Sequence, residues 1–207
     1  MLNHATNHIQ TRYKQAENEM EESIIFEILN KSKSEKELIG IWQYGEDNGF
    51  LMGYVIDFNE DLVLFQHYTN HGKKDGIITL QVAGIQNVDF NDDYAKAMEC
   101  LIEYSDIIDK QPGFKLKLNR TEDWQTELIK QLSENSEIIV SLEINNSYYS
   151  GYVTRATESD FVLHCVGKMG EDEGKVVYRI EDVTEFKIHD FDDRKKDLLF
   201  KWRKASL

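Results

Sequence analysis

Hydrophobic and polar residues alternate with a period of two along one segment in each half of the chain. Every second residue from Ile138 to Ile144 is aliphatic, with Ser141 and Glu143 among the residues between them, and residues 38–44 are the counterpart in the first half. Successive strand residues point to opposite faces, so this alternation predicts a half-buried strand. Further strand patterns follow at Gly53, 62–67, 78–82 and 85–90, and at Gly151, 161–166, 176–180 and 183–188.

The order of glycines, apolar residues and acidic turns occurs twice, at a separation of about 98 residues. This self-similarity predicts an internal duplication, with one sheet in each copy. The matched segments are 53–55 with 151–153, 61–64 with 160–163 after one inserted residue, 76–80 with 174–178 after a compensating gap, and 92–93 with 192–193 at the start of a helix.

Apolar residues at helical spacing flank both predicted sheets. One stripe begins at Ile9 and runs on through Ile24, Ile28 and Leu29, and the others begin at Tyr94, Trp124 and Leu198. Asp92 and Thr121 are suitable helix caps, and Asp192 opens the last helix. A glycine inside the second strand often marks a bulge or a sharp bend. Five short strands with such a bend suit a small barrel, closed or partly closed, which would leave no exposed strand edge.

The second and third predicted strands resemble the Sm-like family of small barrels. The stretch Gly53-Tyr54-Val55-Ile56-Asp57-Phe58 leads through a turn into Leu62-Val63-Leu64, and residues 76–88 resemble the second motif of that family. The pattern is also similar to that of uncharacterised bacterial proteins, and SH3-like barrels are an alternative. The resemblance implies an α+β, mainly β fold of two tandem five-stranded barrels, each flanked by helices. The expected organisation is 1–108 with a barrel at about 38–90, a linker at 109–120, and 121–207 with a barrel at about 138–189.

The resemblance also implies RNA binding, but acidic residues occupy the positions that would make the contacts. Asp61 and Asp160 lie nearest to the asparagine that contacts bases in the RNA-binding members. Asp75-Gly76 and Glu173-Gly174 replace their Arg-Gly signature. Nucleic-acid binding is therefore the alternative function and not the first one.

Composition supports a folded protein with an acidic surface, which suits a basic protein partner. The 207 residues carry 38 acidic and 24 basic side chains, a net charge of −14, which disfavours a phosphate backbone as partner. The basic cluster at 194–204 is interspersed with acids and is expected to be a solvated helix face. No apolar run reaches the ~20 residues of a membrane span. We expect a cytoplasmic protein without a membrane segment or cofactor, whose partner is another protein or a second copy of the chain.

Three residues have the spacing of a metal site. His67, His71 and Asp75 recur every four residues, which on a helix would place three ligands on one face. Here the segment spans a strand end and a turn, so ordinary loop histidines are the alternative. The second copy has no counterpart in the predicted alignment, where His164 matches Phe65. No catalytic residue is expected, because no phosphate loop, dinucleotide fingerprint or nucleophile elbow occurs.

Aromatic residues gather on the first two strands of both copies. Such residues are enriched at protein interfaces and in stacking platforms, although barrel core is the alternative. The expected function is a non-enzymatic binding or adaptor module that recognises protein through a sheet edge or through these aromatics. A small-ligand or metal-dependent enzyme ranks last. The interaction candidates are Trp42, Tyr44, Tyr54, Tyr148, Tyr149 and Tyr152.

Overall fold

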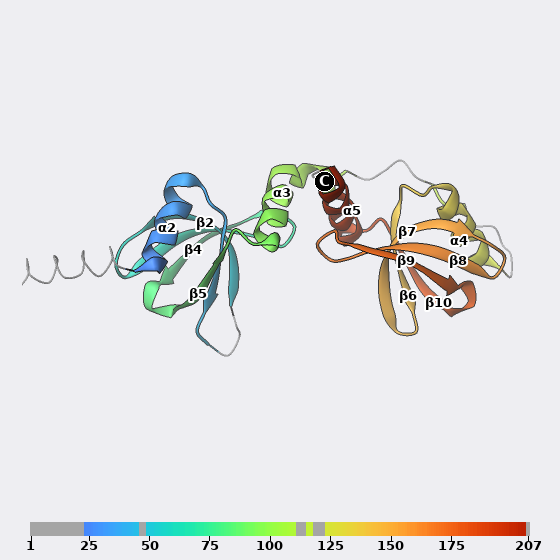
Figure 1. The fold of residues 1–207 in the computed structure, drawn as a ribbon, viewed down its shortest axis with the longest axis horizontal. Coiled ribbons are helices and arrows are strands. Elements are labelled where there is room, and N and C mark those ends of the chain that lie inside the picture. The colour runs from blue at the N-terminus through green and yellow to red at the C-terminus, as the bar shows by residue number, and fades with distance from the viewer. Residues whose placement is uncertain (1–22, 46–48, 111–114, 118–122, 206–207) are drawn as a thin grey trace, which may run out of the picture. The chain divides into compact units, whose positions relative to one another are not determined.

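The chain folds into two units of similar layout, each with helices next to a five-stranded antiparallel sheet (Figure 1). Unit 1 is Met1–Ile102 and unit 2 is Glu103–Leu207. The mixed α+β class, with more strand than helix, is confirmed. The computed structural model describes residues 23–45, 49–110, 115–117 and 123–205. The first part of the helix stripe predicted from Ile9 and the helix cap predicted at Thr121 lie outside the described residues, whereas the continuation of that stripe through Ile24, Ile28 and Leu29 falls in a helix.

Each unit places a helix before its sheet and a helix after it (Figure 1). Unit 1 contains α2 (Ile24–Glu35), β1 (Ile39–Gln43), β2 (Phe50–Phe58), β3 (Leu62–Tyr68), β4 (Lys74–Gln81) and β5 (Ile85–Phe90), and α3 (Asp93–Ile108) crosses the unit boundary. Unit 2 contains α4 (Trp124–Glu134), β6 (Ile139–Ile144), β7 (Ser147–Ala156), β8 (Asp160–Val166), β9 (Asp172–Arg179), β10 (Val183–Ile188) and α5 (Phe191–Ala205). Short 3-10 turns, η1 (Val82–Gly84) and η2 (Ile180–Asp182), precede the last strands.

The strand order is the same in both sheets. It runs β4-β3-β2-β1-β5 in unit 1 and β9-β8-β7-β6-β10 in unit 2, with every neighbouring pair antiparallel. Within the described residues, the outer strands β4, β5, β9 and β10 each pair with one neighbour. The sheets are therefore open, and of the closed or partly closed barrels that the sequence predicted, the closed form is not seen.

Gly53 in β2 and Gly151 in β7 allow the next strand to approach closely. A Cβ atom on Gly53 would lie 2.0 Å from the carbonyl oxygen of Gln66, and one on Gly151 would lie 2.2 Å from the carbonyl oxygen of His164. The register shift in β2 comes later, after Val55. The sequence predicted a bulge or bend at these glycines. Glycine in a strand also marks a close approach of backbones, and that is its role here.

A constant offset of 98 residues relates the two units from the second strand to the last helix. Asp92 accepts a hydrogen bond of 2.6 Å from the backbone N–H of Ala95, and Asp190 accepts one of 2.8 Å from that of Asp193. These caps match each other, so the predicted match of 92–93 with 192–193 is wrong, as are the inserted residue and its compensating gap. The repeated acidic pair was misleading because its second copy lies inside the first turn of α5.

The sheet of unit 2 is buried on both faces. Its main core lies between the sheet and α4, and a smaller core lies on the opposite face beneath α5. Strand β6 contributes to both, because neighbouring strand residues point to opposite faces. The half-buried strand predicted at 138–144 is therefore more enclosed than its pattern indicated: Ile139 is 0% exposed and Ser141 6%. The smaller core consists of Ile139, Tyr152, Val166 and Phe200.

Candidate functional site

The aromatic candidates of unit 1 occupy separate environments. The indole of Trp42 donates a hydrogen bond of 2.6 Å to Asp89, and its ring lies 4.6 Å from that of Phe50. Tyr54 packs edge-on against Tyr68, at 5.7 Å between ring centroids. Tyr44, by contrast, is 67% exposed. Trp42 and Tyr54 are therefore held by neighbours inside the unit, and Tyr44 is the exposed member.

The aromatic candidates of unit 2 also point in different directions. Tyr148 donates a hydrogen bond to Glu185 and lies beneath the ammonium of Lys187. Its neighbour Tyr149 packs against Tyr178 at 5.3 Å. Tyr152 is only 6% exposed. Of the three, Tyr148 and Tyr149 keep exposed surface, at 45% and 39%, on opposite faces of β7.

Tyr152 forms a tyrosine–carboxylate pair with the helix that follows the sheet. Its hydroxyl donates a hydrogen bond of 2.6 Å to Asp197, and burial together with this carboxylate raises the pKa of Tyr152. The equivalent residues in unit 1 are Tyr54 and Glu99, where burial and the charge of Glu99 raise the pKa of Tyr54. The carboxylate thus acts on Tyr54 through its charge, whereas it bonds Tyr152 directly. Sequence reasoning missed the Tyr152–Asp197 pair because the two residues lie 45 positions apart.

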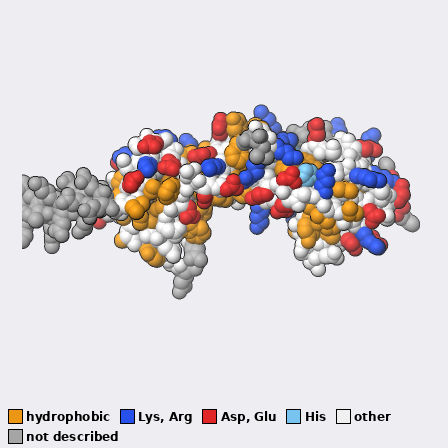
Figure 2. Space-filling view, in the orientation of Figure 1, with side chains coloured by type: hydrophobic (Ala, Val, Ile, Leu, Met, Phe, Trp, Pro, Cys, Tyr) orange, Lys and Arg blue, Asp and Glu red, His pale blue; other side chains and the backbone are white. Residues whose placement is uncertain are grey.

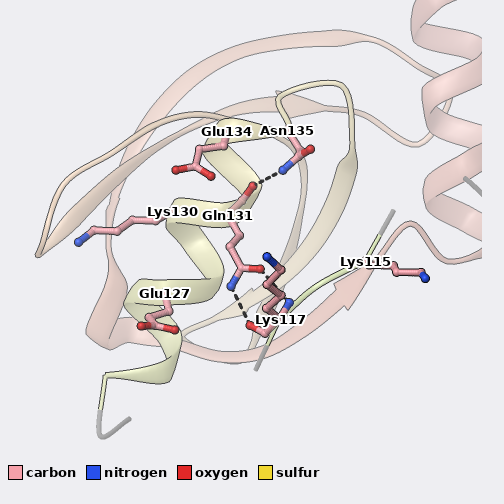
Figure 3. A pocket seen from close by; sticks show the side chains of 7 residues that line it. All are labelled: Lys115, Lys117, Glu127, Lys130, Gln131, Glu134 and Asn135. Carbon is pink, nitrogen blue, oxygen red and sulfur yellow. Dashed lines mark hydrogen bonds between the residues drawn. The ribbon is translucent and has the colours of Figure 1, made fainter. Parts of the chain in front are cut away.

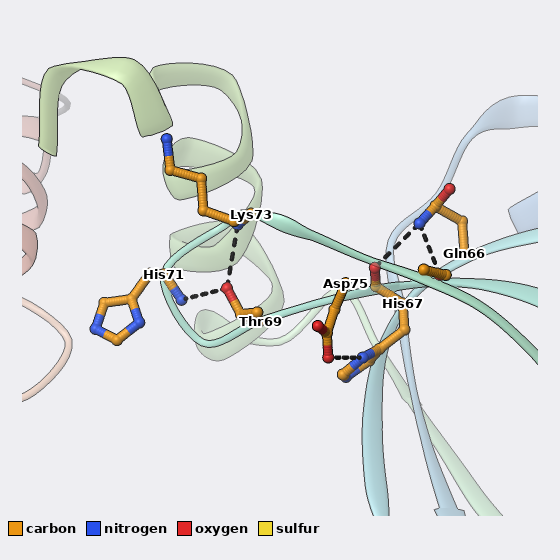
Figure 4. A network of polar contacts seen from close by, with 7 residues as sticks. Gln66, His67, Thr69, His71, Lys73 and Asp75 are labelled. Carbon is orange, nitrogen blue, oxygen red and sulfur yellow. Dashed lines mark hydrogen bonds and ion pairs between the residues drawn. The ribbon is translucent and has the colours of Figure 1, made fainter. Parts of the chain in front are cut away.

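The proposed metal ligands of unit 1 do not meet at one point. His67 Nδ1 lies 3.2 Å from Asp75 Oδ2, whereas the ring of His71 points away from this pair (Figure 4). The turn is organised by Thr69, whose hydroxyl accepts hydrogen bonds from the backbone N–H groups of His71 and Lys73. Among the described residues, no group of three or more His, Cys, Asp and Glu side chains is arranged to hold a metal ion.

Unit 2 has a histidine–aspartate pair of its own between the third and fourth strands. His164 Nε2 lies 2.7 Å from Asp172 Oδ1. The bond to His164 and a second from the N–H of Gly174 hold the pKa of Asp172 below its usual range. The positions equivalent to His67 and Asp75 are Cys165 and Glu173, so the predicted lack of a counterpart in the second copy holds. The pair of unit 2 lies one residue earlier on each strand and therefore on the opposite face of the sheet.

A polar group, here called the Asp193 cluster, is enclosed between α5 and the sheet of unit 2. The hydroxyl of Ser141 donates a hydrogen bond of 2.6 Å to Asp193 and lies 2.6 Å from the hydroxyl of Ser150. Lys196 donates to Ser150 at 2.7 Å and lies 3.9 Å from the carboxylate. The Asp193 side chain is fully buried, and this burial raises its pKa to about 6. Its Oδ2 atom has no hydrogen-bond partner among the described residues.

The Asp193 cluster is specific to unit 2. The four residues of the cluster have small or apolar equivalents in unit 1. The offset of 98 identifies three of them, and strand pairing identifies the equivalent of Ser141. Sequence reasoning missed the cluster, although Ser141 interrupts an aliphatic strand and Asp193 lies on the apolar side of a helix. The corresponding residues of unit 1 are Gly40, Met52, Ala95 and Met98.

The basic residues of α5 hold the helix in place. Arg194 donates to the carbonyl oxygens of Ile108 and His189, and Arg203 donates to that of Met169. Lys195 is 8% exposed, and burial lowers its pKa. On the face drawn in Figure 2, basic and acidic side chains are intermixed over both units. The solvated face predicted at 194–204 is therefore wrong for Lys195, which is buried. Arg194 and Arg203 bond to backbone oxygens within unit 2.

A polar hollow of about 490 Å³ lies between α4 and residues 115–117 (Figure 3). The side-chain amide of Gln131 donates to the backbone oxygen of Lys117 at 2.8 Å and accepts from its N–H at 2.9 Å. One side chain thus satisfies both backbone groups of an extended residue. The hollow is lined by Lys115, Lys117, Glu127, Lys130, Gln131, Glu134 and Asn135.

Strand β9 forms an exposed edge of the sheet in unit 2. Val176 is 39% exposed and Val177 is 67% exposed. Tyr178 packs against Phe161 in the main core, so Val176 lies on that side of the sheet and Val177 on the other. The edge presents aliphatic surface on both faces together with its outward backbone groups. In unit 1 the edge strand β4 exposes Ile77 at 64%.

A second hollow, here called the Trp202 pocket, lies where α5 ends beside β9. Its volume is about 430 Å³. Its lining includes two aromatic residues, Phe200 and Trp202, and the first residue of β9, Asp172. The remaining lining residues are Gly170, Glu171, Arg203 and Lys204.

Within the described residues, no helix combines the length and the apolar character needed to cross a membrane. Comparison with known proteins finds no family model, no curated protein and no solved structure that matches the chain.

Proposed function

We propose that the protein is a non-enzymatic binding module that takes up an extended segment of a partner protein along a free sheet edge. The observation that carries this proposal is Val177, an aliphatic residue that is 67% exposed in the middle of the eight-residue edge strand β9. Natural sheets usually protect such edges with charge, proline, bulges or a covering element. In β9 the register shift and three of the charged residues, Asp172, Glu173 and Lys175, lie in the first half, and Arg179 is the last residue, so residues 176–178 form an uncharged stretch. An added strand would satisfy the outward backbone groups and cover the aliphatic side chains.

The acidic character of the chain favours a basic partner. The net charge of −14 attracts positively charged segments and accelerates their association. Nucleic-acid binding, implied by the Sm-like resemblance, has less support, because Arg194 and Arg203 donate to backbone oxygens of unit 2 and Lys195 is buried. Phosphate binding would have to break these contacts.

A display selection tests the proposal. Random peptides of about 12 residues, displayed on phage, are selected on the full chain, and enriched sequences should alternate apolar and polar residues. Bound peptide should protect amides of the edge strand from hydrogen exchange. Val177→Asp should weaken binding at least about ten-fold, because it places a charge on the contact surface.

Two further variants make this test specific. Ile24→Asp makes a comparable change from an aliphatic to an acidic side chain at a residue of α2 that is 72% exposed and outside both β9 and β4, so it should leave binding intact. Ile77→Asp reports whether β4 contributes. The proposal would be overturned if the peptides bound to Val177→Asp and to Ile77→Asp as tightly as to the native chain. A selection that enriches no alternating sequence would also overturn it.

A further inference from the structure

Helix α5 crosses the sheet of unit 2 and ends at the edge strand. Successive residues of the helix contact the strands in sheet order. The contacts are Asp193 with Ser141 of β6, Lys196 with Ser150 of β7, Asp197 with Tyr152 of β7, Phe200 with His164 of β8, and Lys204 with Asp172 of β9. The last turn of α5 therefore stands beside the first residue of β9, and the Trp202 pocket opens at that corner.

The charged groups around the Trp202 pocket are already paired within unit 2. Lys204 lies 3.8 Å from Asp172, and its ammonium lies 4.2 Å from the centre of the Phe200 ring. Glu171 accepts a hydrogen bond of 2.8 Å from the backbone N–H of Met169. Two acids and two bases line the hollow, so their formal charges cancel. A pocket with balanced charges and aromatic walls favours an uncharged apolar group, because a charged group would lose its hydration without a matching partner.

The strand pairing fixes where a bound segment would end. Every neighbouring pair in this sheet is antiparallel, and β9 runs from Asp172 to Arg179. A segment added antiparallel to β9 would run the opposite way, so its C-terminal end would lie at Asp172, next to the Trp202 pocket. Glu173, which is exposed at the same end, favours a basic residue beside the one that enters the pocket.

We infer that the Trp202 pocket receives a large apolar side chain near the C-terminal end of a basic, extended partner segment bound to β9. This inference rests on the proposed function and specifies the class of partner. Burying one aromatic or leucine-sized side chain there supplies the anchor that backbone pairing alone lacks, since backbone hydrogen bonds are insensitive to sequence.

The phage-displayed random peptides serve as the probe. Sequences that are enriched on the native chain but not on Val177→Asp should carry Trp, Phe, Leu or Met near their C-terminal end, with Lys or Arg adjacent. Replacing that anchor with Ala should weaken binding about ten-fold, and Trp202→Ala should cause a similar loss. In the native chain, the indole N–H signal of Trp202 should shift when peptide is added, while that of Trp42 in unit 1 stays in place.

The outcomes separate the two proposals. Val177-dependent peptides without an apolar preference at that end, or an unmoved Trp202 signal, would overturn this inference and leave edge binding standing. If no enriched peptide loses affinity on Val177→Asp, the inference is overturned. If the peptides also bind to Ile77→Asp as tightly as to the native chain, edge binding is overturned as well. The indole signal keeps the test decisive if Trp202→Ala is poorly folded, because it is measured on the native sequence.

Discussion

Asp193 is fully buried against Ser141, which donates a hydrogen bond of 2.6 Å to one of its carboxylate oxygens, while the other oxygen has no partner among the described residues. Burial of this kind favours the protonated acid, and the pKa of Asp193 is raised from 3.8 to about 6. The folded chain therefore holds this proton more tightly than the unfolded chain does.

The free energy of unfolding should fall as the pH rises from about 4 to about 6, by at most about 3 kcal/mol from this group. Asp193→Asn should remove most of this pH dependence of the free energy of unfolding. Its stability should be closest to that of the native protein near pH 4, where Asp193 is protonated in the folded state. Urea unfolding of unit 2 between pH 4 and pH 7.5 measures both. Asp61→Asn, at an exposed aspartate of unit 1, should keep the native profile. Parallel profiles for the native chain and Asp193→Asn would show that this site does not titrate as argued.

Gly170 closes the β8–β9 loop against the backbone of α5. Its φ is +76°, and a Cβ atom there would lie 2.5 Å from the carbonyl carbon of Leu199. Gly174 has a similar φ of +82° but open space around it. Gly174→Ala should cost about 1 kcal/mol from backbone strain, and Gly170→Ala about 2–4 kcal/mol because the clash adds to that strain. Thermal unfolding of both variants checks the difference, and equal losses would contradict the close packing of loop and helix.

The sequence indicated the elements well because apolar periodicity and turn residues are local signals. It could not show whether the sheets close, because closure depends on the distance between β4 and β5 and no single residue encodes it. The Asp193 cluster escaped detection for a similar reason: Ser141 and Asp193 are 52 positions apart and meet only when α5 packs on the sheet. The prediction that a sheet edge binds a partner stays a hypothesis. The structure supports it with the exposure of Val177.

His189 occupies a left-handed position that suits asparagine better. Its φ is +53°, and Asn91, the equivalent residue of unit 1, has the same φ. The Nδ1 atom of His189 is buried without a partner among the described residues, and burial lowers the pKa of this side chain. His189→Asn should therefore stabilise unit 2 by about 0.5–1 kcal/mol, since asparagine tolerates this conformation and the unpaired ring nitrogen is removed.

The gain from His189→Asn should increase below pH 6.5. A histidine with a depressed pKa stabilises the folded state above its unfolded pKa, and this contribution is lost as the pH falls through the depressed value. Chemical unfolding at pH 7.5 and pH 5.5 measures the change. Asn91→His is the reciprocal variant and should destabilise unit 1. A loss of stability in His189→Asn at both pH values would contradict the assigned strain.

Gln131 holds residue 117 by bonds in both directions, and the two bonds can be removed separately. Gln131→Ala deletes both, so the amide of Lys117 should exchange with solvent about five-fold faster, as expected for a hydrogen bond worth ~1 kcal/mol. Gln131→Glu keeps an oxygen that accepts from this N–H but places its other carboxylate oxygen, which cannot donate, against the carbonyl, so exchange at Lys117 should lie between the native rate and that of Gln131→Ala. Hydrogen-exchange mass spectrometry or NMR on the full chain measures the amide directly. Equal exchange rates in the two variants would show that the amide of Lys117 is protected by something other than the Gln131 side chain.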